Sequence, residues 1–328
     1  LGRPPRSAPP GGQPKPAGRI TLGQFVMFNT YLVMLVWPMI AFGWVVNLAQ
    51  RGSASLARIN AIMREEPSIT EPAEILHAGP LRGDIEFRGA GMDYGTVKAL
   101  DGIELRIPAG ATVAVVEHTG SGKTTLVQLI PRMMDPTSGS VLIDGVDVRA
   151  HSVAALRRQI GFVPQETLMF SSTLAENIAL GVEEASREQI SRAADLAGLT
   201  PDIESFPDGL DTVIGERGIT LSGGQKQRTA IARALLRDPR ILVLDDALSS
   251  VDTVTEDRIL GRLAEVMRGR TTILISHRVS TVRGADRIFV VEKGRIAEQG
   301  THSELLALGG YYADLHQRQL LEEELEAI

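Results

Sequence analysis

The stretch ATVAVVEHTGSGKTTL, residues 111–126, predicts a β-strand that turns into a helix around a phosphate-binding loop. The run from Thr112 to Val116 is apolar and β-branched, as a buried strand is, and residues 120–122 form a glycine-rich turn before a helix that starts at Lys123. This strand, turn and helix, in this order, distinguish a phosphate site from a chance match. The pattern departs from its usual form at its first position, where Glu117 replaces glycine.

The residues of this loop suit a bound polyphosphate. Backbone N–H groups of the turn converge on the phosphates, the helix N-terminus adds its dipole, and Lys123 brings a positive charge to the β and γ phosphates. Thr124 offers a hydroxyl to Mg²⁺. A second apolar run, ILVLDD at 241–246, ends in two carboxylates, of which Asp245 is suited to hold Mg²⁺ through water and Asp246 to face an attacking water. Taken alone, that run favours a core strand that ends in a turn.

The N-terminal part of the chain combines a flexible segment with an apolar helix. Residues 1–18 are rich in proline and glycine and cannot build a core. The run FVMFNTYLVMLVWPMIAFGWVV, residues 25–46, carries no charge and is long enough as a helix to cross a hydrocarbon core of about 30 Å. The alternatives are a buried core helix and a signal-peptide core, but the run is too long for the latter and has the wrong flanks. We expect the helix to continue past the membrane until Pro67.

We therefore divide the chain into a flexible segment, a transmembrane helix with its cytoplasmic extension, a linker and a folded domain, at residues 1–18, 19–66, 67–80 and 81–328. In the last part, short β-rich runs (ATVAVV, VLIDG, ILVLDD, TTILIS, RIFVVE) alternate with amphipathic stretches. This alternation is typical of an α/β domain on a largely parallel sheet. The tail YYADLHQRQLLEEELEAI predicts an acidic amphipathic helix that docks or faces solvent.

Composition excludes several classes of function. The hydrophobic content of 43% and a mean hydropathy of +0.03 favour a membrane part. The sequence has no cysteine, which excludes disulfides, a catalytic thiol and thiolate metal sites and fits a reducing compartment. A net charge of -6 and a pI near 5.6 leave no electrostatic footprint for nucleic acid, so we expect no nucleic-acid partner.

Further motifs reveal a family resemblance. LSGGQKQR at 221–228 resembles the signature motif of ATP-binding cassette (ABC) transporters, and it occurs together with TGSGKTT and ILVLDD. Tyr94 matches the aromatic residue that stacks on adenine in that family. Four shorter motifs stand in the family's order, namely the Q-loop VPQE at 163–166, the X-loop IGERG at 214–218, the D-loop SSVD at 249–252 and the switch histidine in ISH at 275–277. A single Tyr94 or His277 would be taken for a core residue, and it is the order and spacing of all the motifs that favours the family.

The resemblance implies a P-loop NTPase fold of the ABC ATPase type. This fold is an α/β domain with a largely parallel sheet, an antiparallel β edge and a helical subdomain at about residues 166–238. Its implied activity is ATP hydrolysis coupled to export, with each ATP held between the phosphate loop of one chain and the signature helix of a second chain. The implied catalytic residues are Gln165, Asp246 and His277, and the implied Mg²⁺ ligands are Thr124, Gln165 and Asp245. The implied ATP contacts are Tyr94, Thr119, Gly120, Ser121, Gly122, Lys123, Thr124, Thr125, Gln165, Ser222, Gly223, Gly224, Gln225 and Asp252.

Two residues depart from the family pattern. The family usually has glutamate after the strand aspartate, as the base that polarises water, and here Asp246 is one methylene shorter. Because general-base catalysis needs a reach of about 2.6–3.2 Å, we expect slow hydrolysis at this site. Glu117 is the second departure, and we expect weakened but surviving ATP binding. An intact LSGGQ beside a shortened base resembles the degenerate-site partner of heterodimeric exporters. A slow homodimer and a soluble or regulatory ABC ATPase are the alternatives.

The resemblance also predicts partners and location. Residues 19–66 resemble the last transmembrane helix of half-transporters of the multidrug and lipid exporter type, so the other five helices of such a protein are expected outside this sequence, which begins at Leu1. The predicted partners are a second half-transporter, membrane lipid and a transported substrate that the sequence does not identify. The predicted location is the inner (plasma) membrane, with the nucleotide-binding domain in the cytoplasm.

Overall fold

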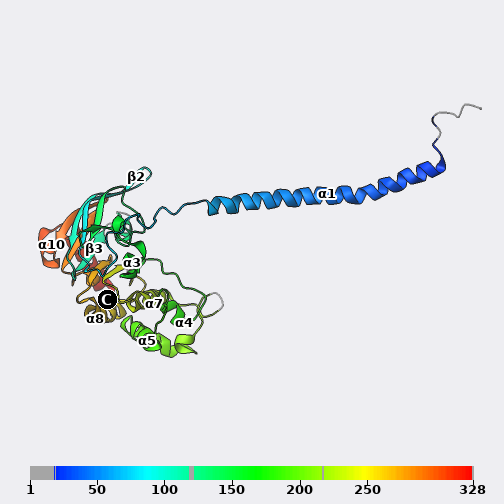
Figure 1. Cartoon of the computed structure of the whole chain (residues 1–328). Coiled ribbons are helices and arrows are strands. Elements are labelled where there is room, and N and C mark those ends of the chain that lie inside the picture. Colours follow the sequence, from blue (N-terminus) through cyan, green and yellow to red (C-terminus); the bar gives the residue numbers. More distant parts are fainter. Residues whose placement is uncertain (1–17, 19, 118–121, 216–217, 327–328) are drawn as a thin grey trace, which may run out of the picture. The chain divides into compact units, whose positions relative to one another are not determined.

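The structure is a computed structural model that describes residues 18, 20–117, 122–215 and 218–326. The chain divides into two compact units, Leu1–Pro67 and Ser68–Ile328. Figure 1 shows the long helix α1, Leu22–Met63, in the first unit and the strands and helices of the second. A capping box starts α1, since the Thr21 hydroxyl accepts the backbone N–H of Gln24 and the Gln24 side chain accepts that of Thr21.

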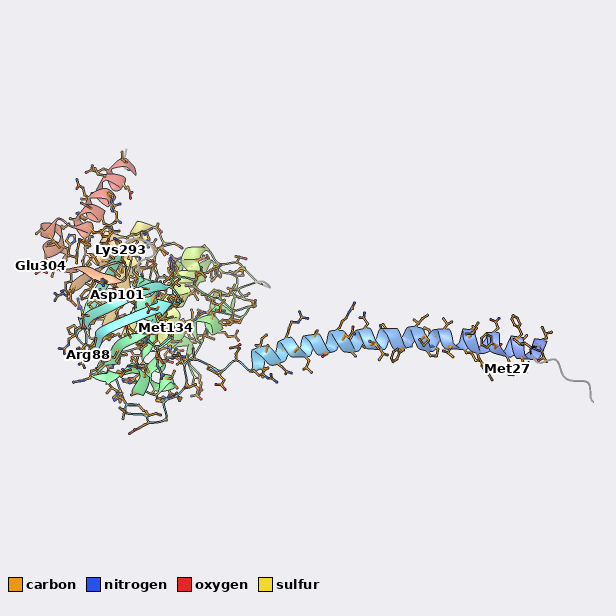
Figure 2. The ribbon with its side chains drawn as sticks, turned by 90° about the horizontal axis from the view of Figure 1, so that it is seen from above. Met27, Arg88, Asp101, Met134, Lys293 and Glu304 are labelled. Atoms are coloured by element: carbon orange, nitrogen blue, oxygen red, sulfur yellow. The ribbon has the colours of Figure 1, made fainter. Side chains whose placement is uncertain are left out.

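Helix α1 contains the whole apolar run that the sequence predicts as a membrane span and continues past it. At 1.5 Å per residue the helix is about 63 Å long, so a hydrocarbon core of about 30 Å takes up about half of it. Its apolar side chains, Met27 among them, are exposed (Figure 2). Among the described residues, α1 is the one helix whose length and mean hydropathy, 2.0, suit a membrane crossing. It ends at Met63, shortly before Pro67.

The second unit is built on a six-stranded sheet with the strand order β10-β9-β3-β8-β7-β6. The strands from β9 to β6 pair in parallel, and β10 pairs antiparallel with β9 at the edge. Strands β7 and β8 are buried along their whole length, as expected because a parallel sheet is covered on both faces. The strands are β3 (Thr112–Glu117), β6 (Ile160–Val163), β7 (Ile241–Asp245), β8 (Thr271–Ile275), β9 (Arg287–Glu292) and β10 (Arg295–Gly300).

A four-stranded antiparallel sheet, of order β2-β1-β4-β5, packs beside it. Its strands are β1 (Ile85–Tyr94), β2 (Val97–Ile107), β4 (Ser138–Ile143) and β5 (Val146–Asp147). The run VLIDG, which the sequence groups with the strands of the α/β part, lies here. Asp144 and Gly145 both have positive φ, and the tight turn that they form returns the chain as β5. The predicted fold class, a largely parallel sheet with an antiparallel β part and a helical subdomain, is confirmed.

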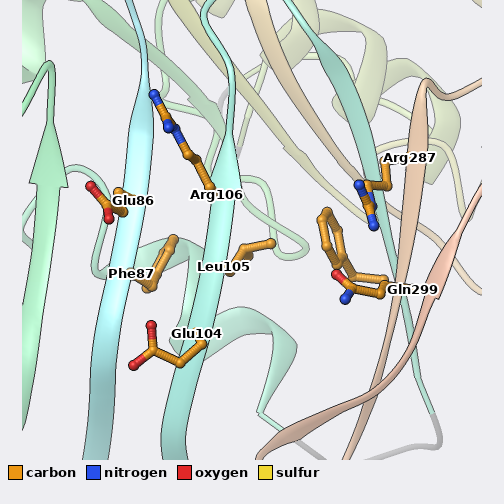
Figure 3. Close-up of a pocket in the computed structure, with 8 residues that line it drawn as sticks. Glu86, Phe87, Glu104, Leu105, Arg106, Arg287 and Gln299 are labelled. Carbon is orange, nitrogen blue, oxygen red and sulfur yellow. The ribbon is translucent and has the colours of Figure 1, made fainter.

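The two sheets meet along a groove of about 260 Å³ (Figure 3). Strands β1 and β2 line it with Glu86, Glu104 and Arg106, and strands β9 and β10 with Arg287 and Gln299. None of the residues that line the groove is among the residues predicted to bind nucleotide. The groove is therefore a polar seam between the sheets and is distinct from the predicted site.

Successive residues of the parallel strands point to opposite faces of the sheet and build two cores. On one face Val243 and Ile273 pack with residues of the antiparallel sheet and of α2 and α3. On the other face Leu242 and Leu274 pack with the remaining helices, of which α4, α5 and α7 form a group of their own (Figure 1). The helices are α2 (Lys123–Gln128), α3 (Val153–Arg158), α4 (Leu174–Ile178), α5 (Arg187–Leu196), α6 (Thr200–Ser205), α7 (Gly223–Leu236), α8 (Thr253–Met267), α9 (Val279–Val282), α10 (His302–Leu308) and α11 (Tyr311–Glu326), with 3-10 turns η1 (Val148–Ala150) and η2 (Gly209–Asp211).

The predicted linker, residues 67–80, makes specific contacts with the domain. The Glu71 carboxylate accepts the backbone N–H groups of Val153 and Ala154, at 3.0 and 3.1 Å, where α3 begins. These two bonds hold the pKa of Glu71 below its usual range, and the bond from Ala154 has the larger effect. Further along, the N–H of Leu76 donates to the carbonyl of Ala150 at 2.9 Å. The segment thus runs along the start of α3.

Candidate functional site

The strand order brings the ends of β3, β8 and β7 together. Strand β8 lies between the other two, and Ile275 at its end pairs with Val115 of β3 on one side and Asp245 of β7 on the other. Carboxyl ends of parallel strands meet at one edge of a sheet, where open α/β sheets bind their ligands. The residues that follow these strands, Asp246 after β7 and His277 after β8, therefore leave the sheet side by side.

Three of the predicted site residues are in contact at this edge. The ammonium group of Lys123, at the start of α2, lies 3.9 Å from Oδ2 of Asp246, and Nδ1 of His277 lies 3.4 Å from Oδ1 of the same carboxylate. The side chains of Lys123 and Asp246 are about one-tenth exposed, whereas that of His277 is 57% exposed. The edge of the sheet thus presents a carboxylate between a lysine and an accessible imidazole.

The backbone fixes the position of Asp246. Its φ of 47° lies in the left-handed region, which aspartate tolerates better than most residues because its short polar side chain bonds locally. Its N–H donates to the carbonyl of Ile275 at 3.0 Å, and its own carbonyl accepts the N–H of Ser249 at 3.2 Å. This turn directs the carboxylate toward Lys123. Asp245, one residue earlier, is buried at the end of β7, at 1% exposure.

The described part of the phosphate loop fits a polyphosphate ligand. Gly122, the residue before α2, has φ 106°, and a Cβ there would overlap the carbonyl oxygen of Ala99, so only glycine lets the loop approach this closely. Lys123 begins α2, Thr124 is exposed beside it, and Thr125 is half-buried. The predicted contacts Thr119, Gly120 and Ser121 lie outside the described residues.

Tyr94 and Gln165 reach the surface on other elements. Tyr94 ends β1 at the tip of the β1–β2 hairpin, its ring is 47% exposed, and its hydroxyl lies 3.1 Å from Sδ of Met134. This exposed face is available for stacking on a flat ligand. Gln165 is exposed in the turn after β6, and its side chain makes no hydrogen bond to any other described residue of the site. The structure thus brings Lys123, Asp246 and His277 into contact, and Gln165 follows β6, whose last residue, Val163, pairs with Leu244 of β7.

The signature residues form the start of α7. Ser222 is its N-cap in a capping box, since its hydroxyl accepts the N–H of Gln225 while the Gln225 side chain accepts that of Ser222. The next two glycines lie against the D-loop, because a Cβ on Gly223 would come within 3.2 Å of Cβ of Ser250 and one on Gly224 within 3.1 Å of its carbonyl oxygen. The capping box uses the N–H groups of Ser222 and Gln225, which leaves those of Gly223 and Gly224 for an anion.

Two buried residues that the sequence did not single out connect these loops. The Gln227 side chain on α7 donates to Oγ of Ser249 at 2.8 Å and accepts the N–H of Ser250 at 2.9 Å. Glu256 on α8, 1% exposed, pairs with Arg278, whose guanidinium also donates to the carbonyl of Val251 at 3.0 Å. A polar residue inside the apolar face of a helix was the available signal for Gln227, and no local pattern indicates the pairing of Glu256.

Asp252 belongs to the D-loop as a helix cap. Its Oδ1 accepts the N–H of Thr255 at 2.9 Å at the start of α8. This bond holds the pKa of the Asp252 carboxyl below its usual range. Asp252 is thus ionised at neutral pH and exposed on the same surface as Ser250.

Known proteins resemble both the sequence and the fold. The family described as "ABC transporter" matches residues 100–249. The probable multidrug resistance ABC transporter ATP-binding/permease protein YheI of Bacillus subtilis is 43% identical over 92% of this chain and 52% of its own length. An ATP-dependent lipid A-core flippase of Desulfotalea psychrophila is 43% identical over 94% of this chain and 54% of its own length. A bacterial Atm1-family ABC exporter, solved with ATP bound, superposes with a TM-score of 0.78 at 38% identity, over 92% of this chain and 53% of that one.

These matches extend well beyond the family's motifs, since they take in nine-tenths of the chain. The chain spans about half the length of the curated relatives it matches. The matched region includes β7, the signature helix α7 and the loops that carry Lys123 and Asp246. The chain therefore carries an ABC-type ATPase domain, preceded by one apolar helix.

Proposed function

We propose that this chain is the ATP-binding and ATP-hydrolysing part of an exporter subunit, which couples the closure of two nucleotide-binding domains to transport across the inner membrane. The observation that carries the proposal is the convergence of Lys123, Asp246 and His277 at one edge of the sheet, together with an open signature helix. Helix α1 supports the membrane part, and the relatives' names point to multidrug or lipid export.

ATP with Mg²⁺ fits the residues of this edge. The left-handed backbone of Gly122, with φ 106°, suits a turn whose N–H groups face a phosphate, and Lys123 supplies the positive charge. The donor set suits Mg²⁺ because a hydroxyl, an amide and a carboxylate, those of Thr124, Gln165 and Asp245, are hard oxygen ligands. Bound MgATP would supply the phosphoryl group that water attacks. Asp246 and His277 would then orient that water and the γ phosphate.

Within the exporter class, the chain is best suited to be the partner with a degenerate hydrolysis site. Aspartate at position 246 is a methylene shorter than the family's glutamate and already lies beside Lys123, at 3.9 Å. The signature start, Ser222 to Gly224, keeps its capping box and its glycines. We infer that the chain contributes to hydrolysis mainly in trans, by completing the site of a glutamate-bearing partner. A homodimer with two slow sites is the second candidate, because Asp246 remains a carboxylate.

Transport needs more than this chain. A single helix such as α1 encloses no path across the bilayer, and Asn29 and Pro38 within it need neighbouring helices to satisfy their polar groups. The proposed partners are therefore a second half-transporter, the missing helices and membrane lipid, with the nucleotide-binding domain on the cytoplasmic side.

The decisive experiment compares ATP turnover in two reconstituted preparations. One holds the full-length subunit alone, and the other holds it with the half-transporter encoded beside it, if that protein has glutamate after its strand aspartate. We expect turnover in the mixed pair and little in the subunit alone. Equal turnover in both would favour the homodimer, and absence of ATP binding in both would overturn the proposal.

A further inference from the structure

The C-terminal helix α11 is fixed at its start by a carboxylate. Both carboxylate oxygens of Glu298 on β10 accept backbone N–H groups of the first turn, from Tyr311 at 2.6 Å and from Tyr312 at 3.3 Å. Gly310 makes this approach possible, because a Cβ there would overlap the Glu298 carboxylate. An acidic group at a helix N-terminus also favours the helix dipole. The position of α11 is thus set from the edge of the main sheet.

Tyr312 anchors one face of α11. Its side chain is fully buried, and its hydroxyl lies 2.8 Å from Nδ1 of His302 on α10. Burial raises the pKa of Tyr312 to about 12, so the hydroxyl stays protonated and available as a donor. Residues seven apart lie on the same face of a helix, so Gln319 shares the docked face with Tyr312. Gln317, two residues before Gln319, is exposed.

Gln319 makes two hydrogen bonds to the backbone that flanks the switch histidine. Its amide nitrogen donates to the carbonyl of His277 at 2.6 Å, and its amide oxygen accepts the N–H of Val279 at 2.8 Å. An amide side chain that donates and accepts to the same short segment fixes that segment against translation and rotation. Without it, the N–H of Val279, the first residue of α9, has no partner within its helix.

The opposite side of the same loop is held by α8 and the D-loop. Arg278 pairs with buried Glu256 and donates to the carbonyl of Val251, while its N–H donates to Oγ of Ser276 at 3.0 Å. Gln319 therefore completes a clamp on residues 276–279. Between the two sides of the clamp, the His277 imidazole is free to reach Asp246, at 3.4 Å, and is 57% exposed.

We propose that Gln319 is a positioning residue that sets the His277 side chain against Asp246 and the γ-phosphate site. The C-terminal helix, which the sequence marks as acidic and either docked or solvated, is thereby part of the hydrolytic apparatus. The inference rests on the proposed ATPase function, in which His277 orients the reacting phosphate. It requires α11 to act through the backbone of His277, since the side-chain hydrogen bonds of Gln319 within the described part of the chain go to His277 and Val279.

The kinetic test is a double-mutant cycle in the assembled transporter. The partner's glutamate is changed to glutamine, so that the remaining turnover comes from this chain's own site. We expect Gln319→Ala to lower this remaining kcat by about fivefold with KM for ATP unchanged, since it removes two hydrogen bonds to the backbone around His277 and leaves Lys123 and Tyr94 in place. In a His277→Ala background the same change should have no further effect, because the two residues act as one unit. Gln317→Ala, the same residue type on the exposed side of α11, is the matched control and should leave kcat unchanged.

Two further measurements do not depend on hydrolysis. In the full chain in detergent, Gln319→Ala should shift the imidazole resonances of His277 and speed exchange of the Val279 amide, whereas Gln317→Ala should do neither. Gln319→Glu keeps the acceptor for Val279 but places a carboxylate oxygen against the His277 carbonyl, so it should protect that amide and still shift His277.

The outcomes separate the two hypotheses. The positioning role would be overturned if the His277 resonances were unchanged in Gln319→Ala. It would also be overturned if Gln319→Ala lowered kcat equally in the wild-type and His277→Ala backgrounds. Absent ATPase activity in the wild-type assembly would instead overturn the proposed function, and the resonance and exchange data would still decide whether Gln319 places His277.

Discussion

The strand-end site and the signature end of α7 differ in what holds them together. At the strand ends, polar side chains contact one another, with Lys123 and His277 on either side of the Asp246 carboxylate. At the signature, Ser222 and Gln225 satisfy each other's backbone, and the adjacent glycines lie against Ser250. The first region is held by contacts between side chains, and the second is built mainly from backbone groups.

From this difference we expect one region to tolerate sequence change better than the other. A carboxylate that is a methylene short still pairs with Lys123, so the strand-end site keeps its structure while it loses reach toward a water molecule. An anion site made of backbone N–H groups has no side chain to adjust, so a charge placed at one of its glycines acts directly on the bound anion. We therefore expect the largest effects from the signature and smaller ones from the strand-end site.

The largest effect should come from Gly223→Asp in the complex with a glutamate-bearing partner. The new carboxylate would stand where the partner's γ phosphate binds, and loss of such an anion site lowers kcat by roughly 100-fold or more. The measurement is steady-state ATPase rate of the purified pair. Gly223→Ala is the control, since it adds the Cβ near Ser250 without the charge and should cost far less. Equal losses in both variants would show that crowding, and not charge, matters.

Lys123→Ala should weaken ATP binding by about tenfold or more, because it removes a charge-assisted contact to the β and γ phosphates. Titration with ATP under non-hydrolysing conditions measures this. Lys293→Ala, at an exposed turn between β9 and β10, is a control for loss of one positive charge. If the affinities of wild type and Lys123→Ala are equal, the strand-end site is not the nucleotide site of this chain.

Asp246→Asn should change turnover of the pair by less than about threefold, whereas a working base would lose far more. Asparagine has the same shape and also tolerates the left-handed conformation of this residue, so the fold should be unaffected. Asp246→Glu restores the side-chain length that the family uses to reach the attacking water. It should at most about double the rate, by adding a second working site. The ATPase assay of the pair decides. A loss with Asp246→Asn as complete as with Gly223→Asp would replace the degenerate-site proposal with a slow homodimer or a coupled two-site mechanism.

The sequence predicted those features that depend on local pattern. The continuous apolar runs of β7 and β8 and the glycine turn before Lys123 indicated the parallel sheet and its phosphate loop. The contacts between loops did not follow from the sequence, because they depend on strand order. Nothing in the sequence brings β8 between β3 and β7, and that order is what sets Asp246 beside His277. Gln319 and His277 are 42 residues apart and meet only through the docking of α11.

The smallest effect concerns Glu117, the residue that departs from the phosphate-loop pattern. It ends β3, where it pairs with Val291 of β9. Its negative charge lies close in sequence to the glycines of the loop. A single like charge near a bound polyphosphate opposes it by a few tenths to about 1 kcal/mol if water screens the pair. Glu117→Gly should therefore tighten ATP binding by roughly two- to fivefold, since about 1.4 kcal/mol corresponds to tenfold.

The change to glycine has a second consequence that a control must remove. Glycine inside a strand destabilises it by roughly 0.5–1 kcal/mol, which could loosen the end of β3 and offset the gain. Glu117→Gln removes the charge and keeps the side chain, so it isolates the electrostatic part. Titrations at low and high salt add a further check, because screening weakens the repulsion and should bring wild type and Glu117→Gln together. If Glu117→Gln binds ATP more weakly than wild type at low salt, the carboxylate assists binding, and the strand-end site gains an acidic member that the family pattern lacks.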